Sequence, residues 1–232
     1  MSQMRYIILI ISVLFLFVKC ATKPAIVRDL KPVVDKEYIS ATNNIAIISK
    51  DNIVIKVKYL NKIELRKLAE KNNPYLEDSS TPLLTTFRID IYNNRKEKIE
   101  IDTKDAILLD GLGNQFNALT YSAFKELYPT TIYKDYQYSF IFNRYYVEER
   151  YTDDYYKRRK VAKTLFKGGI IYPQVHVTGI LAFPRVSERA RTIRLILPDI
   201  KIYKKDKDIL TTFDVEIKFI QKVVRLKNGI GM

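Results

Sequence analysis

Side chains that commonly carry enzyme chemistry are sparse in this sequence. Its 232 residues include one cysteine, Cys20, and one histidine, His176. Nucleophilic catalysis needs a base within hydrogen-bond reach of the nucleophile, and a structural zinc site needs several cysteine or histidine ligands. The alternation of QVHVTGILAF, residues 174–183, places His176 on the outward face of a predicted strand. We therefore predict no catalytic residue, no metal site and no cofactor.

Carboxylates are more numerous, but their pattern is typical of a solvated surface. Two carboxylates at a defined separation can hydrolyse a glycosidic bond. Here the acidic pairs are mostly adjacent in sequence, as in Glu148 with Glu149, or they occupy outward positions of predicted strands. A calcium loop needs a denser acidic run with glycine at the bend. The run DTKD, residues 102–105, carries a lysine in its middle and does not meet that requirement.

One segment combines tyrosine with basic residues. Ten of the 17 tyrosines fall between Tyr121 and Tyr156, where they alternate with arginine and lysine. Tyrosine and arginine are enriched in protein interfaces, where they supply rigid contact area and hydrogen bonds. The pattern predicts a candidate interaction surface made of Tyr145, Tyr146, Tyr151, Tyr155, Arg158, Arg159 and Lys160. In the alternative interpretation, these tyrosines pack the segment onto the rest of the fold and the cations stay in water.

The first twenty residues have the pattern of an export signal. Arg5 precedes an apolar run over residues 6–18, and Lys19 and Cys20 follow it. A charged start and a short apolar stretch are typical of secretory signals. With a cysteine at its end, the stretch resembles a bacterial lipoprotein signal. The resemblance implies that Cys20 receives lipid and becomes the new N-terminus, so that the protein is anchored in the membrane of a bacterial envelope and faces the periplasm or the exterior.

This signal departs from the usual lipoprotein pattern at two positions. That pattern has a branched apolar residue three positions before the cysteine and a small residue directly before it, whereas this chain has Phe17 and Lys19. An uncleaved anchor, ordinary signal cleavage and a buried structural helix remain as alternatives. The apolar run, about thirteen residues long, is shorter than the roughly 20 residues that a spanning helix needs.

The net charge of +14 indicates anionic partners. Nucleic acid, phospholipid head groups and acidic envelope polymers all fit, although the many Lys, Ile, Asn and Tyr residues are also what an AT-rich genome produces without any binding requirement. An exported chain would not meet nucleic acid, so we predict no nucleic-acid partner. We expect another envelope protein or an anionic envelope surface as partner, and no intrachain disulfide because there is no second cysteine.

Alternating apolar residues predict an antiparallel β-sandwich. The clearest strand covers residues 209–219, with apolar residues at every second position from Phe213 to Phe219. Turn residues separate the strands at the spacing typical of sandwiches. Other strands are predicted at residues 44–49, 53–60, 83–92, 96–102, 106–110, 115–119, 174–183 and 192–198. Asn61, followed by Glu64, predicts the capped start of a short helix over residues 62–71.

Between residues 121 and 167 the pattern becomes helical. Residues 121–128 predict a short helix, and Thr152 predicts the cap of a second helix that runs to about Lys167. Residues 136–146 fit a helix or a strand. We therefore expect a helical insertion at about 121–167 in a sandwich domain over 44–220. A signal at 1–20 and a tether at 21–43 would precede this domain, and a tail at 221–232 would follow it.

The order of these elements resembles immunoglobulin-like lipoproteins of bacterial envelopes. The motifs that carry the resemblance are TTFRIDIYNN at residues 85–94 and IYPQ with GILAF at residues 171–174 and 179–183. In that family a glycine often follows the proline, where this chain has Gln174. The resemblance implies a mainly β, immunoglobulin-like sandwich in a bacterial envelope, and it adds little on mechanism. Because we find no set of catalytic residues, we predict a structural or adaptor role without enzyme activity. A periplasmic carrier of an apolar ligand and an enzyme acting on envelope glycans or lipids remain as alternatives.

Overall fold

The computed structural model describes residues 25–68, 71–76, 83–139, 144–205 and 208–226. Contacts divide the chain into two compact units: residues 28–222 form one, and residues 1–27 with 223–232 form the other. The fold described below is that of residues 28–222. The predicted signal at 1–20, with Cys20 at its end, lies outside the described residues.

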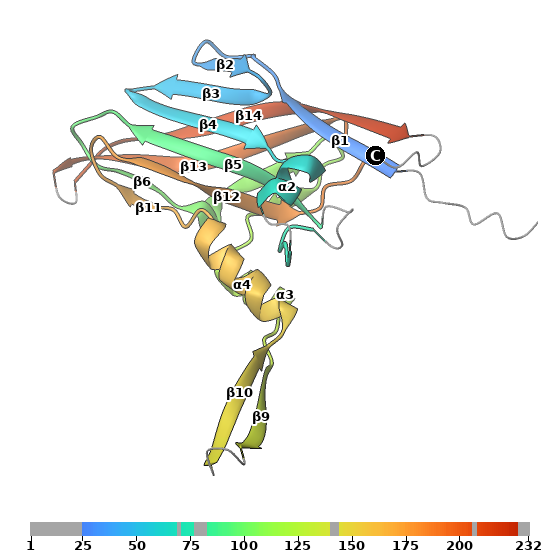
Figure 1. Ribbon diagram of the computed structural model, residues 1–232. Helices are drawn as coiled ribbons and strands as arrows, with labels where there is room; N and C mark the ends of the chain where they lie inside the picture. Colours follow the sequence, from blue (N-terminus) through green and yellow to red (C-terminus); the bar gives the residue numbers. More distant parts are fainter. Residues whose placement is uncertain (1–24, 69–70, 77–82, 140–143, 206–207, 227–232) are drawn as a thin grey trace, which may run out of the picture. The chain divides into compact units, whose positions relative to one another are not determined.

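The first of two antiparallel sheets has five strands in the order β12-β5-β4-β3-β2 (Figure 1). Its strands are β2 (Ile39–Thr42), β3 (Ile45–Lys50), β4 (Ile53–Tyr59), β5 (Leu84–Asn93) and β12 (His176–Pro184). Val57 of β4 lies opposite Ala46 of β3 and Ile89 of β5. All three side chains are fully buried, so this register fixes one apolar face of the sheet.

The second sheet has seven strands and is built around β13. Its members are β1 (Ala25–Pro32), β6 (Ile99–Ile101), β7 (Ile107–Asp110), β8 (Gln115–Asn117), β11 (Gly169–Ile171), β13 (Thr192–Lys205) and β14 (Asp208–Leu226). β13 pairs with β14 and also with β6 and β7, which a 3₁₀ turn at Thr103–Asp105 separates. Leu195 of β13 lies between Ile217 of β14 and Leu108 of β7.

The core lies between the two sheets and is centred on aromatic rings. Phe87 of β5 is fully buried, and its ring centroid lies 5.2 Å from that of Phe219 in β14 and 6.2 Å from that of Phe183 in β12. The inward positions predicted for β14 are also correct, because Val215 and Ile217 are fully buried. The predicted mainly β, antiparallel sandwich is therefore confirmed.

A second buried cluster lies on the opposite face of the five-stranded sheet. Leu181 and Phe183 of β12 belong to the main core, whereas the alternate residues Ile180 and Ala182 belong to this second cluster. Three helices each contribute one buried residue to it: α2 (Lys62–Leu68) with Leu65, α3 (Tyr121–Leu127) with Phe124 and α4 (Asp153–Thr164) with Val161. The helices therefore pack on the sheet through their own small core.

The predicted cap of the first helix is confirmed. The side-chain Oδ1 of Asn61 accepts hydrogen bonds from the backbone N–H of Ile63 at 3.0 Å and of Glu64 at 3.1 Å. In return, Glu64 Oε2 accepts a bond from the backbone N–H of Asn61 at 3.1 Å. These reciprocal bonds satisfy N–H groups that the first turn of a helix leaves without partners.

The predicted tether and tail need correction. Residues 25–32 and 39–42 of the expected tether are the strands β1 and β2, and Leu30 and Ile39 are buried in the core. Arg28 occupies a buried position of β1 and interrupts the apolar alternation that would have indicated a strand. At the other end, β14 continues to Leu226, so the first residues of the expected tail are also strand.

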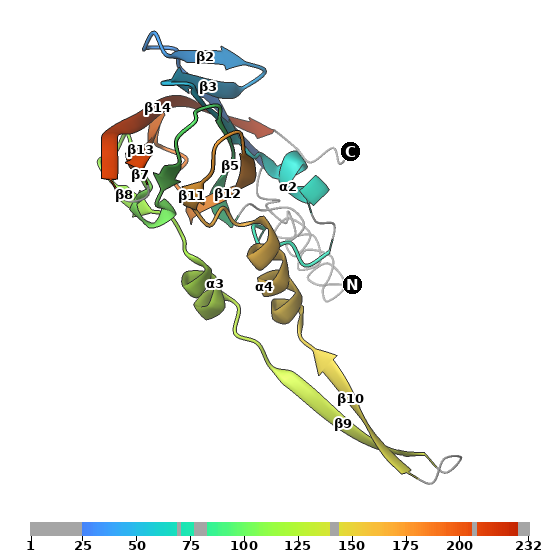
Figure 2. The same ribbon diagram turned by 90° about the vertical axis from the view of Figure 1, so that its left-hand side faces the viewer.

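The predicted helical insertion is only partly helical. Between α3 and α4 the chain forms an antiparallel hairpin of β9 (Ile132–Ser139) and β10 (Arg144–Tyr151). Figure 2 shows α3 and α4 side by side, with the two strands continuing from them. Tyrosine fits both an amphipathic helix and a strand, so its spacing did not distinguish the two structures.

Candidate interaction surface

Hydrogen bonds connect α3 and α4, the two helices of the tyrosine-rich segment, to the residues near Tyr75. The hydroxyl of Tyr128, at the end of α3, donates a hydrogen bond to the carbonyl oxygen of Pro74 at 2.6 Å. The hydroxyl of Tyr75 lies 2.6 Å from Thr164 Oγ1, at the end of α4. Burial disfavours the charged phenolate and raises the pKa of Tyr75 and of Tyr128 to about 12.

Helix α4 begins where the sequence predicts, after Thr152, but it lacks the capping hydrogen bond that we expected from this residue. Thr152 is the N-cap residue, but its side chain makes no capping hydrogen bond, and its hydroxyl is buried without a partner. Asp153 and Asp154 in the first turn complement the positive end of the helix dipole. The helix ends at Thr164 rather than near Lys167.

Two of the three predicted cations hold α4 in place. The guanidinium of Arg158 donates a hydrogen bond to Thr130 Oγ1 at 2.7 Å, and its Nε is buried without an acceptor. The Nζ of Lys160 donates to the backbone carbonyl of Lys71. Both side chains are therefore only partly accessible, and they connect α4 to segments that are distant in sequence. Arg158 and Lys160 are better described as anchors of the helix than as part of an accessible surface.

The exposed face of α4 consists of residues three or four positions apart. Arg159 is exposed, and so are Tyr156, Lys163 and Asp153. Residues at this spacing lie on one side of a helix, opposite the buried Val161. Of the predicted cations, Arg159 is therefore the one that a partner could reach. Tyr156 belongs to the tyrosine-rich segment of the sequence but was not included in the predicted surface, and Lys163 was missed. Helical spacing from Arg159 could have indicated both.

Aromatic stacking connects the end of β10 to the start of α4. The rings of Tyr151 and Tyr155 stack with centroids 4.2 Å apart, and Tyr155 meets Tyr156 edge-on at 5.5 Å. The hydroxyl of Tyr151 donates a hydrogen bond to Glu149 Oε2 at 2.8 Å, which raises the pKa of Tyr151. Tyr151 and Tyr155 are half-buried, so each presents only part of its ring to solvent.

Tyr145 and Tyr146 can be placed by backbone register alone. They belong to β10, where Tyr145 lies opposite Tyr138 and Tyr146 lies opposite Gln137. Their side chains lie outside the described part of the structure. The predicted surface is thus divided between a hairpin strand and a helix.

Several large apolar side chains near the ends of α3, β9 and α4 are exposed. Leu127 is 46% exposed, Ile132 50%, Tyr133 58% and Tyr156 41%. Leu127 ends α3, Ile132 and Tyr133 begin β9, and Tyr156 lies in the first turn of α4. Exposed aromatic and aliphatic groups close to cations are typical of binding surfaces. We call the exposed residues Leu127, Ile132, Tyr133, Tyr156, Arg159 and Lys163 the insertion surface.

His176 lies on the outward face of the five-stranded sheet, as predicted. Its ring stacks on that of Tyr92 with centroids 4.1 Å apart and planes 5° apart. Its Nε2 is 3.7 Å from Asp90 Oδ1, and the Nζ of Lys56 lies over the Tyr92 ring at 4.8 Å. These contacts connect the outer surfaces of β4, β5 and β12.

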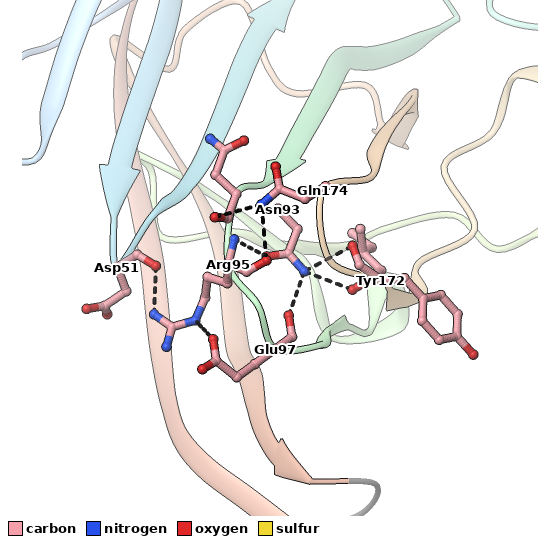
Figure 3. Close-up of polar contacts among 8 residues, drawn as sticks. Asp51, Asn93, Arg95, Glu97, Tyr172 and Gln174 are labelled. Atoms are coloured by element: carbon pink, nitrogen blue, oxygen red, sulfur yellow. Dashed lines mark hydrogen bonds and ion pairs between the residues drawn. The ribbon is translucent and has the colours of Figure 1, made fainter.

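A polar cluster around Asn93 fixes the loops at the end of β5 (Figure 3). Asn93 is fully buried, and its Nδ2 donates to the carbonyl oxygens of Glu97, Ile171 and Tyr172 at 2.9 to 3.1 Å. Arg95 reaches the backbone oxygen of Asp51 at 2.8 Å. The hydrogen bonds of this cluster are made among residues of three loops, so we assign it a structural role.

A buried arginine links the two ends of the sandwich domain. Gln221 Oε1 accepts hydrogen bonds from Nε and Nη2 of Arg28, the former at 3.1 Å. Gln221 Nε2 donates to the backbone oxygens of Ser187 at 3.0 Å and of Ala190 at 2.7 Å. Desolvation lowers the pKa of Arg28. The side-chain amide of Gln221 therefore bonds to the buried guanidinium of Arg28 and also to the loop that contains Ser187 and Ala190.

Within the described ranges, no helix combines the length and apolar character needed to cross a membrane. The same part of the chain holds no group of three or more His, Cys, Asp or Glu side chains that could bind a metal ion. Comparisons with models of known protein families, with curated proteins and with solved structures found no match.

Proposed function

We propose that this chain is a lipid-anchored lipoprotein of a bacterial envelope that holds a protein-binding surface at the membrane. The apolar run at residues 6–18, with Cys20 directly after it, supports the anchor. The mainly β, antiparallel sandwich supports an immunoglobulin-like scaffold. In this proposal the role of the protein is structural or adaptor-like, and lipid on Cys20 joins it to the membrane.

The observation that carries the proposal is the exposed face of α4. Tyr156, Arg159 and Lys163 lie on a helix that the buried Val161 and the hydrogen bond from Arg158 to Thr130 hold to the rest of the domain. A rigid element presents its side chains with little loss of conformational entropy on binding. Tyrosine and arginine are also the residues most often found at energetic centres of protein interfaces.

We infer that the partner is another envelope protein. An anionic envelope surface is the alternative, since the chain carries a net charge of +14. The two differ in specificity: a protein interface depends on particular side chains, whereas attraction to an anionic surface depends mainly on total charge.

Affinity capture from native membranes tests this proposal. The variant Arg159→Glu/Lys163→Glu should lose a protein that the wild type captures, because it reverses both charges on the exposed face of α4. The matched control Lys96→Glu/Lys104→Glu changes the net charge equally at exposed positions elsewhere and should retain that protein. Equal loss from both variants would support the anionic surface instead, and unchanged capture by the α4 variant would contradict the proposed surface.

The choice of variants follows from the structure. Replacing Arg158 or Lys160 by glutamate would break hydrogen bonds that hold α4, so loss of binding could reflect loss of structure. Arg159 and Lys163 avoid this problem because both are exposed.

A further inference from the structure

The hairpin of β9 and β10 is a two-stranded sheet on its own. In the described part of the chain, each of its strands pairs only with the other. Isolated two-stranded hairpins are marginally stable in water, and three or more strands with an apolar face are usually needed for independent stability. An additional strand along one edge would therefore stabilise this hairpin.

The backbone register of the hairpin places two acidic residues opposite each other. Asp135 of β9 lies directly opposite Glu148 of β10. Like charges opposite one another on a sheet are destabilising. Arg144, on the same face of the hairpin, lies opposite the neutral Ser139. A cation supplied on the other side of Glu148 would offset the unfavourable pair.

The charge of the hairpin also differs from that of the chain. Its three basic residues balance its three acidic residues: Lys134, Arg144 and Arg150 against Asp135, Glu148 and Glu149. The chain as a whole carries +14, so two copies repel each other over most approaches. The neutral hairpin is a segment where two copies can meet without that repulsion.

We propose that two copies of this chain pair antiparallel along the outer edges of their β10 strands, centred on Tyr146. In this register Arg144 lies opposite Glu148 of the partner subunit, and two-fold symmetry repeats the pair. A register centred on Val147 would oppose Arg144 to Arg150 of the partner subunit. A register centred on Glu148 would oppose two glutamates. The charges of β10 therefore select the register centred on Tyr146.

Pairing in this register also completes an apolar face. Tyr145 lies opposite Val147 of the partner subunit, while within each hairpin Tyr138 is opposite Tyr145 and Tyr136 is opposite Val147. The result is a four-stranded sheet with two rows of apolar residues on one face, which is what a lone hairpin lacks. This dimer goes beyond the proposed function and requires neither the lipid nor the envelope partner.

Charge reversal in the full-length protein tests the dimer. Sedimentation of the wild type in mild detergent should show a monomer–dimer equilibrium. Glu148→Arg removes the acidic pair within the hairpin but opposes two arginines across the dimer, so it should weaken the dimer about tenfold or more. Arg144→Glu should weaken it similarly, and the double variant Arg144→Glu/Glu148→Arg should restore wild-type association. A monomeric wild type, unaffected single variants or a double variant that fails to associate would each overturn the inference.

Disulfide trapping tests the register without reversing charges. Directly opposite residues have Cβ atoms about 4.5–5.5 Å apart, close enough for cysteines at the two-fold axis to form a bond after small adjustments. Tyr146→Cys should therefore give a disulfide-linked dimer on mild oxidation. Tyr133→Cys in β9 should not, and the wild type controls for Cys20. Equal trapping at both positions would overturn the register. Envelope-partner capture by a protein found to be monomeric would refute the dimer and leave the proposed function standing.

Discussion

The backbone of Phe166 lies directly over Gly179. A Cβ atom added to Gly179 would come within 2.6 Å of Phe166 Cα and 2.8 Å of its backbone N. That N–H donates a hydrogen bond to the carbonyl oxygen of Ile180 at 2.9 Å, directly after Gly179 in β12. The chain leaving α4 is thereby fixed to the five-stranded sheet, and this close approach accounts for a glycine in the middle of a strand.

The first prediction concerns this contact. Gly179→Ala should lower the free energy of unfolding by about 2–3 kcal/mol, because the backbone of Phe166 cannot move aside without losing its hydrogen bond. Thr178→Ala, at the exposed neighbouring position, should change it by no more than about 0.5 kcal/mol. Urea denaturation measures both values. Equal stability of the two variants would show that β12 accommodates the extra methyl group.

The second prediction concerns Gln174. It occupies the position where the immunoglobulin-like lipoproteins that this sequence resembles often have glycine. Its φ of 60° is in the left-handed region that glycine favours, and its Nε2 donates to the backbone oxygens of Asn94 at 3.1 Å and of Arg95 at 3.4 Å. Gln174→Ala loses these bonds and keeps the strain. Gln174→Gly loses the same bonds but relieves the strain, so it should be about 1 kcal/mol more stable than the alanine variant. Thermal denaturation of the pair checks this order, which the reverse result would contradict.

The third prediction is a pH dependence from Tyr75. Its pKa of about 12 in the fold exceeds the ordinary value of 10 for tyrosine, so the unfolded chain loses the proton first as the pH rises. Its contribution to stability is complete below pH 10 and is lost between pH 10 and 12, with a slope of up to about 1.4 kcal/mol per pH unit.

Tyr75→Phe isolates this effect. Near pH 8 the wild type should be more stable than the variant by about 1 kcal/mol, because the variant lacks the hydrogen bond to Thr164. Above pH 10 the difference should shrink, since phenylalanine has no proton to lose. Tyr133→Phe, at a position 58% exposed, is the control and should follow the wild type. A constant difference between the wild type and Tyr75→Phe from pH 8 to 12 would contradict the assigned burial.

Parts of the fold that depend on neighbouring residues could be predicted from the sequence. The alternation of β14 gave its buried face, and the pair of Asn61 and Glu64 gave the start of α2. In both cases the relevant contacts repeat every two residues or lie within one helical turn. β1 was missed because Arg28 stands at a buried position, and the residue that satisfies it, Gln221, is 193 positions away.

The candidate surface could be predicted only as a segment. Its composition selected a segment that includes the exposed Arg159, but it did not indicate the contacts of the residues beside Arg159. Arg158 bonds to Thr130, 28 positions away, and Lys160 bonds to Lys71, 89 positions away. Which cations remain exposed therefore depends on how α4 packs, and local spacing does not contain that information.

Fatty-acid labelling of Cys20 tests the central proposal most directly. Cells that express the full-length protein would be grown with a labelled fatty acid, and the protein would be recovered from membrane and soluble fractions. We predict a labelled wild type in the membrane fraction and an unlabelled Cys20→Ala variant that is no longer retained there. A wild type without label, or a Cys20→Ala variant retained in the membrane as well as the wild type, would contradict the lipid anchor.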